Sequence, residues 1–271
     1  MALSRREFLE RALLGAGGAL LAGPLLRGVV GMGRASLFRP GILRYDGHWD
    51  GRPTCLRTVL SELERRTSVE VAREPTRVSA GDEGLFALPF LWMSGDRPME
   101  AFSPSAVENL RRHVRFGGTL LVDDTSGRED SEFAASFRRE IERIFPGRRL
   151  EALEKGHAIY RSFYHLKRPA GRRQVSDELE AIVIDDRAAV VFSRNDLSGA
   201  LERDGTGAWQ YPMAGAPMEA RDLSLRLGVN LVIYAMTVNY KLDQVQISYQ
   251  LRHPGRYPEA TPLPPEESGQ R

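Results

Sequence analysis

Two adjacent carboxylates, Asp123 and Asp124, directly follow the apolar segment 119–122 and are the residues best placed to do chemistry. Such a pair could bind a divalent cation, or divide acid and base roles if the two environments differ. Aspartate is also common in loops that cap the next helix, so a structural role remains the alternative.

Other polar residues could join them. His157 lies in the aromatic segment 156–164, where a histidine is either a ligand-binding or catalytic group or a hydrogen-bonded core residue. Asn195 and Asp196 follow the apolar segment 188–192, where they could reach a pocket or form a plain turn. We interpret these three residues, with Asp123 and Asp124, as the primary candidates for ligand binding.

Three secondary candidates lie at the ends of other apolar segments. Trp49 and Asp50 follow the segment 41–45, and we expect Trp49 to pack and Asp50 to cap a helix. Gly95 follows the segment 85–93, at the predicted end of a second strand. Ligands of open parallel sheets bind beyond the carboxyl ends of strands, which is where these residues fall.

The sequence lacks the common signatures of hydrolases and nucleotide-binding proteins. It contains no Gly-x-Ser-x-Gly, His-Glu-x-x-His, phosphate-loop or Gly-x-Gly-x-x-Gly motif. Cys55 is the single cysteine, which excludes an internal disulfide and a multi-cysteine metal site within one chain. It falls in the apolar phase of a predicted helix, so we expect a buried, inert thiol.

The elements that position these residues alternate between strand and helix. Strands are predicted at 41–45, 68–71, 85–93 and 119–122, and helices at 53–66, 104–116 and 133–144. Asp185-Asp186-Arg187 separates two apolar segments and indicates a β-hairpin, and 223–238 is predicted as a core helix. The pattern predicts an α/β fold with a doubly wound, mainly parallel sheet, an added hairpin and a C-terminal core helix.

The N-terminus predicts export. Arg5-Arg6, followed by Phe8-Leu9 and an apolar, glycine-rich segment 12–26, is typical of a twin-arginine signal. We therefore expect residues 1–35 to address the protein to the periplasm or cell envelope, with the twin-arginine translocase as a partner. An uncleaved segment that anchors the protein in the membrane stays open, although 12–26 is short for a span.

Removing residues 1–35 leaves a nearly neutral domain. Of 38 basic and 36 acidic residues, five arginines and two glutamates are lost, which leaves 33 against 34. This balance gives no electrostatic reason to expect a nucleic acid partner. We expect a single α/β domain at 36–251 and a disordered, proline-rich tail at 252–271.

Taken in order, the motifs resemble a known family. They are Arg44-Tyr45-Asp46-Gly47-His48-Trp49-Asp50, Pro53-Thr54-Cys55, Leu88-Pro89-Phe90-Leu91, Phe116-Gly117-Gly118-Thr119-Leu120-Leu121-Val122-Asp123-Asp124, Gly156-His157-Ala158-Ile159-Tyr160, Asn195-Asp196-Leu197 and Arg226-Leu227-Gly228-Val229-Asn230. The set is similar to the family called domain of unknown function 4159, over about residues 40–240. The resemblance implies a fold like class I glutamine amidotransferase or flavodoxin-like domains, and an envelope location.

The resemblance does not imply amidotransferase chemistry. The nucleophile of that fold would follow the strand 119–122, where this chain has Asp123-Asp124-Thr125 and no cysteine. We therefore expect a non-catalytic module that binds a small polar ligand or an envelope protein, with no cofactor specified. The alternative is a hydrolase, with or without a metal ion, that acts on an envelope glycan or peptide.

Overall fold

The computed structural model describes residues 37–215 and 219–252. Its strands are β1 (Pro40–Arg44), β2 (Thr76–Ser79), β3 (Phe90–Gly95), β4 (Thr119–Asp124), β5 (Glu151–Ala152), β6 (Glu180–Ile184) and β7 (Arg187–Ser193). Its helices are α2 (Cys55–Arg66), η2 (Glu83–Ala87), α3 (Pro104–Arg115), α4 (Glu132–Ile144), η3 (Ala158–Arg161), α5 (Leu197–Leu201) and α6 (Ala220–Arg252). The predicted signal and nearly all of the predicted tail lie outside the described residues.

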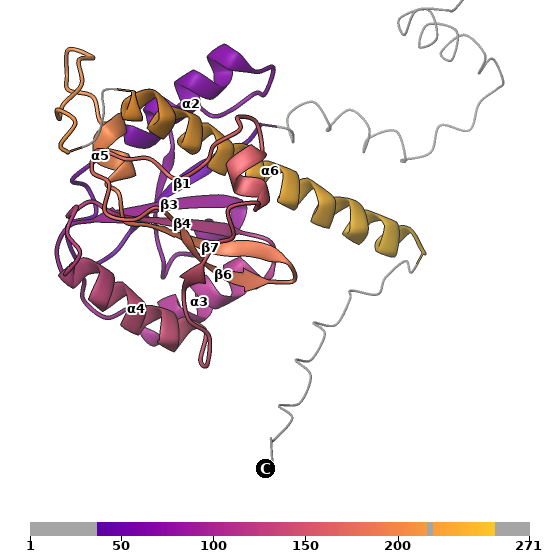
Figure 1. Cartoon of the computed structure of the whole chain (residues 1–271). Coiled ribbons are helices and arrows are strands. Elements are labelled where there is room, and N and C mark those ends of the chain that lie inside the picture. Colours follow the sequence, from indigo (N-terminus) through magenta and orange to yellow (C-terminus); the bar gives the residue numbers. More distant parts are fainter. Residues whose placement is uncertain (1–36, 216–218, 253–271) are drawn as a thin grey trace, which may run out of the picture. The chain divides into compact units, whose positions relative to one another are not determined.

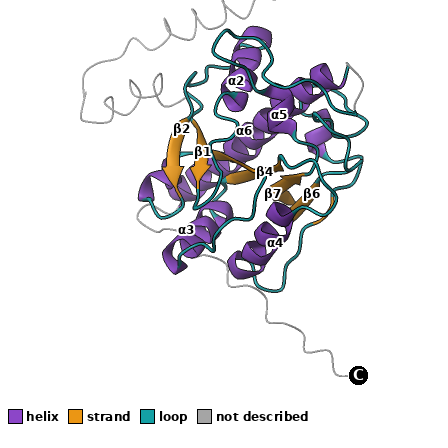
Figure 2. Ribbon diagram, turned by 90° about the vertical axis from the view of Figure 1, so that its left-hand side faces the viewer, coloured by secondary structure: helices purple, strands orange, loops and turns teal. Residues whose placement is uncertain are grey.

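The strands form one sheet of seven, in the order β2-β1-β3-β4-β7-β6-β5. The pairs from β2 through β7 are parallel, whereas β6 and β5 pair antiparallel at one end. Helices cover both faces, with α3 and α4 on one side and α2, α5 and α6 on the other (Figures 1 and 2). The predicted doubly wound α/β fold is confirmed.

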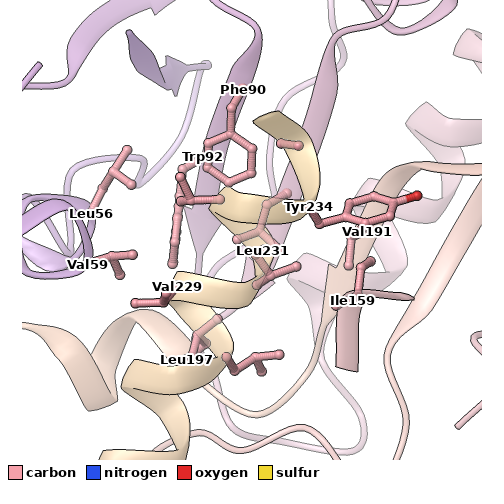
Figure 3. Close-up of a cluster of buried hydrophobic side chains, with 14 of the residues drawn as sticks. Leu56, Val59, Phe90, Trp92, Ile159, Val191, Leu197, Val229, Leu231 and Tyr234 are labelled. Atoms are coloured by element: carbon pink, nitrogen blue, oxygen red, sulfur yellow. The ribbon is translucent and has the colours of Figure 1, made fainter. Parts of the chain in front are cut away.

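The core has two layers, one on each face of the sheet. The layer under α2, α5 and α6 packs Leu56, Trp92, Val191 and Leu231 together (Figure 3). On the other face, Leu110 of α3 and Phe137 of α4 pack against apolar side chains of the same strands. Strand residues alternate between faces, so each buried strand supplies both layers.

The helix boundaries follow from local capping. The Ser103 hydroxyl accepts a hydrogen bond from the Ala106 amide at 3.2 Å, and Pro104 occupies the first turn of α3. After α3 the chain passes Gly117 at φ 106°, a left-handed conformation that favours glycine. The Ser131 hydroxyl likewise accepts from the Ala134 amide at 3.1 Å at the start of α4.

One predicted strand was wrong, and a second begins later than predicted. The segment 68–71 contributes only an isolated bridge from Val71 to Phe38, and the edge strand β2 forms instead at Thr76–Ser79. Only the second half of the apolar segment 85–93 is strand, because Glu83–Ala87 forms the 3-10 helix η2. Length and apolar content do not separate a buried strand from a short buried helix.

The predicted hairpin is confirmed, with one difference. Asp185 and Asp186 both have positive φ, 50° and 58°, as a tight two-residue turn between β6 and β7 requires. However, β7 is not peripheral: it lies between β4 and β6 and is fully buried. The predicted C-terminal core helix is also present, as part of the longer α6.

Candidate functional site

The parallel strands end at one side of the sheet, here called the carboxyl edge: the ends of β1, β3, β4 and β7 and the loops that follow them. Seven of the eight predicted residues lie there. They are Trp49 and Asp50 after β1, Gly95 at the end of β3, Asp123 and Asp124 at the end of β4, and Asn195 and Asp196 after β7. The two β4 carboxylates were expected in a loop, but the ladder continues through them: Asp123 pairs with Ser94 and Ser193, and Asp124 with Gly95.

Asp123 is fully buried and caps the short helix α5. Its Oδ1 accepts a hydrogen bond from the Leu197 amide at 3.0 Å, and its Oδ2 accepts from the Ser198 amide at 2.7 Å. Burial, reinforced by the negative charge of Asp196, raises the pKa of Asp123 to about 6. Both carboxylate oxygens therefore have a structural function.

Asp196 caps the same helix from a strained conformation. Its backbone is left-handed at φ 53°, and its Oδ1 accepts from the Gly199 amide at 2.9 Å. The Arg172 guanidinium donates to its Oδ2, and Arg52 Nε lies 3.8 Å from its Oδ1. Burial raises the pKa of Asp196, although the charges of Arg172 and Arg52 oppose the rise.

Asn195 holds a loop. Its Oδ1 accepts from the amides of Val175 and Ser176 at 2.8 Å each, and its Nδ2 donates to the Ser176 carbonyl at 2.8 Å. Its own carbonyl accepts from the Arg173 amide at 3.1 Å. The amide side chain therefore bonds to backbone groups with both its oxygen and its nitrogen, and it fixes the segment that carries Arg172.

Asp124 differs from its neighbour because one of its oxygens is free. Oδ1 accepts from the Ser126 amide at 2.9 Å, whereas Oδ2 is buried and has no hydrogen-bond partner among the described residues. The Nε atoms of Arg52 and Arg194, which lie at the same edge, are likewise buried and unpartnered there. Three of the six such atoms among the described residues lie at this edge. A native structure contains few atoms of this kind, and each calls for an explanation such as a bound polar group.

Two arginines and a tyrosine at this edge were missed in the sequence. The Arg52 guanidinium lies 4.2 Å from the centre of the Tyr211 ring and donates to its hydroxyl at 3.1 Å. Arg172 lies over the same ring at 5.7 Å. The three residues are far apart in the chain, and no spacing or motif connects them, so only the fold could bring them together.

A histidine–aspartate pair also occupies the carboxyl edge. His48 Nδ1 lies 2.7 Å from Asp96 Oδ1, and both side chains are partly exposed. His48 follows β1 and Asp96 follows β3, so the pair bridges two adjacent strands whose connections run in opposite directions. Ligands of doubly wound folds bind at this switch point.

The secondary candidates have mixed outcomes. Trp49 packs as expected, under the Arg44 guanidinium at 5.4 Å, and borders a cavity of about 230 Å³ at the ends of β1 and β2. Asp50 is exposed and does not cap the helix, because the residue at the N-cap of α2 is Thr54. At Gly95 a side chain would meet Tyr45 and Phe133 at 2.3 Å, so this glycine is needed for packing.

His157 does not join the group. Its ring packs against Tyr234, with centroids 5.4 Å apart, and the Tyr234 hydroxyl accepts from the Ala188 amide at the start of β7. Asp123 pairs with Ser193, at the other end of that strand. At 3.3 Å per residue, Ala188 and Ser193 are about 16 Å apart. His157 caps η3, which comes between β5 and β6 and borders the same cavity as the turn before β7. It therefore lies at the amino edge, where the parallel strands begin.

Neither a metal cluster nor a membrane span is found in the described part of the chain. Residues 37–215 and 219–252 contain no group of three or more His, Cys, Asp or Glu side chains placed to hold a metal ion. None of the helices described there is both long and apolar enough to cross a bilayer.

The fold and the carboxyl edge define a doubly wound α/β domain whose polar residues gather beyond the ends of its parallel strands. Residues 40–236 match the family model named "Domain of unknown function (DUF4159)". Because the match covers most of the chain, this protein belongs to the DUF4159 family. A comparison with curated proteins finds no significant match.

Proposed function

We propose that this protein is an exported module of the cell envelope that binds a small polar ligand or a partner loop at its carboxyl edge. The observation that carries the proposal is that three buried polar atoms at this edge, Asp124 Oδ2, Arg52 Nε and Arg194 Nε, form no hydrogen bond with the described residues. Arg52 Nε has only the longer ion pair with Asp196, at 3.8 Å. Around them, Asp123, Asn195 and Asp196 are held by backbone hydrogen bonds and form a rigid frame. Preorganised polar groups favour binding because few side chains and loops must lose conformational entropy when the ligand binds.

Export is proposed from the twin arginines and is tested separately. Replacing Arg5 and Arg6 with lysine keeps the positive charge but removes the arginine pair. We expect the variant to accumulate as a folded precursor in the cytoplasm, whereas the wild-type chain reaches the envelope fraction. Unchanged export of the lysine variant would refute the twin-arginine route without affecting the binding proposal.

Binding is tested with Asp124→Asn, which keeps the shape of the side chain and the bond from Ser126. The chain is crosslinked in its native envelope, and bound molecules are identified by mass spectrometry. We expect capture to fall at least tenfold in the variant and to remain in Arg139→Gln, an exposed change on α4. Equal capture by wild type, Asp124→Asn and Arg139→Gln would rule out this site.

A hydrolase is the second candidate, and a specific observation supports it. The predicted acid–base group, His157, lies at the wrong edge, but the His48–Asp96 pair lies at the right one. Asp96 would orient the His48 ring and leave Nε2 to take a proton from water or a hydroxyl. If the protein cleaves an envelope glycan or peptide fraction, His48→Gln should lower the rate by about 100-fold or more and leave capture intact.

A further inference from the structure

A cavity of about 640 Å³ lies at the amino edge of the sheet, away from the site proposed above. It is bordered by the end of α3, by η3, by the turn between β6 and β7, and by α6. Its volume is within the range of sites that enclose small organic ligands.

Three arginines border this cavity. Arg115 ends α3 and Arg161 ends η3; both are exposed, and neither forms an ion pair or side-chain hydrogen bond with the other described residues. Arg187 is buried and donates to the carbonyls of Gly118, at 2.8 Å, and Val114. The cavity therefore has two guanidinium groups available to a ligand and a third whose charge is held in place.

His157 adds a neutral donor. Its Nδ1 accepts a hydrogen bond from the Ile159 amide at 3.2 Å, which leaves Nε2 to carry the hydrogen of the neutral ring. Burial, and then the nearby charge of Arg161, lower the pKa of His157, so the neutral ring predominates at pH 7. The ring lies against Tyr234, and together they form an aromatic wall of the cavity.

The charges of the lining limit the ligand. Asp185 and Asp186, in the β6–β7 turn, also border the cavity and would repel a highly charged anion. With three arginines and a neutral histidine, the lining carries a formal net charge of +1. A singly charged acid is matched to this lining, whereas a phosphate ester with two charges is not.

We propose that the cavity binds a small aromatic monoacid, with the acid group between Arg115 and Arg161 and the aromatic body beside His157 and Tyr234. The Nε2–H group of His157 donates to the same acid group. This site goes beyond the proposed function, since it lies at the opposite edge of the sheet. The proposal would remain valid if the carboxyl edge bound nothing.

The test is calorimetric titration of the full-length protein with 1-naphthoate. Its neutral counterpart, 1-naphthamide, has the same aromatic body without the charge, and inorganic phosphate presents charge without the body. We expect 1-naphthoate to bind with a Kd of about 1 mM or tighter, from ordinary ligand efficiencies. The amide and phosphate should each bind at least about tenfold more weakly.

Variants then locate the binding. Arg115→Gln and Arg161→Gln should each weaken the binding of 1-naphthoate, and the double variant should weaken it at least about tenfold. None of these variants should change the binding of 1-naphthamide. Arg139→Gln removes an exposed charge elsewhere and should change nothing. The proposal is overturned if 1-naphthoate does not saturate the wild type, if the amide binds equally well, or if the folded double variant binds like wild type.

Discussion

At the level of single residues, the two adjacent carboxylates of β4 differ because neighbouring side chains of a strand point to opposite faces of the sheet. Asp123 faces the layer that contains α5 and gives both oxygens to that helix. Asp124 turns to the loop after β4, bonds Ser126 with one oxygen and keeps the other unpaired among the described residues. One aspartate therefore uses both oxygens to stabilise α5, whereas its neighbour has one buried oxygen without a hydrogen-bond partner among the described residues.

The first prediction concerns Asp123→Asn. Asparagine retains one acceptor oxygen, so one buried amide at the start of α5 loses its partner. We expect the free energy of unfolding to fall by about 1–3 kcal/mol at pH 7.5, measured by urea denaturation. Glu129→Gln, an exposed change in the loop before α4, is the control and should lie within about 0.5 kcal/mol of wild type.

The same residue predicts a dependence of stability on pH. The pKa of Asp123 rises from 3.8 to about 6 on folding, so the native state binds its proton more tightly than the unfolded chain does. Its contribution to stability is therefore complete below pH 3.8 and is lost as the pH rises through about 6. The variant should lack this decline; an identical pH profile in both proteins would contradict the assigned pKa.

Residue types near strand ends were a good guide to location and a poor guide to role. Seven of the candidates lie at the carboxyl edge because parallel strands end together, which a strand–helix pattern already implies. Their partners are backbone amides from distant segments, as between Asn195 and Val175, and no pattern in the sequence specifies such contacts. The prediction that His157 joins the other candidates was wrong for the same reason, since its position depends on the path of the chain between β5 and β6.

At the level of elements, Asn230 fixes η3 and the loop after it to α6. Its Oδ1 accepts from the amides of Phe163 and Tyr164, and its Nδ2 donates to the carbonyls of Ile159 and Tyr164. The side chain is fully buried and satisfies four backbone groups that no strand or helix pairs. The wall of the amino-edge cavity thus depends on one amide in the middle of a helix.

The second prediction follows from this connection. Asn230→Ala would remove the partner of four backbone groups, one in a buried hydrogen bond and three in partly buried ones. We expect the free energy of unfolding to fall by about 3 kcal/mol. Thr237→Ala, on the same helix but exposed, should cost less than about 1 kcal/mol. Hydrogen exchange should show faster opening at 159–164 in the Asn230 variant; unchanged protection there would contradict this function of the side chain.

Elements with strong local signals were predicted well, and those without were not. α3 and α4 were recognised because Ser103 and the glycines after α3 mark the boundaries and apolar residues recur at helical spacing. β2 has one buried residue, Val78, and two exposed ones, and it is a strand only because β1 offers a pairing edge. Such tertiary pairing is not encoded in a four-residue pattern.

At the level of the whole molecule, the two core layers share five strands of the sheet, β1, β3, β4, β6 and β7, so they should unfold together. The third prediction compares Leu60→Ala on α2 with Leu110→Ala on α3, both fully buried but on opposite faces. Each should lower the free energy of unfolding by about 2–5 kcal/mol, and the double variant by about the sum. Leu223→Ala, at an exposed site, is the matched control.

The measurement is thermal unfolding followed by both circular dichroism and tryptophan fluorescence. A shared sheet predicts coincident transitions in every variant. Two separate transitions would show that the layers are independent. The sequence predicts the doubly wound class from strand–helix alternation, but the position of β7 could not be predicted, because the turn residues Asp185 and Asp186 do not specify which other strand β7 pairs with.

The position of β7 has a consequence for how the chain reaches its native state. β4 is complete at Asp124, yet its second neighbour begins at Arg187, so the whole segment between them must be synthesised first. Until then β4 presents an open, apolar edge that can pair with other chains. Contacts so distant in sequence form slowly. A truncated or stalled chain would therefore be prone to aggregate until β7 has been made and has paired with β4.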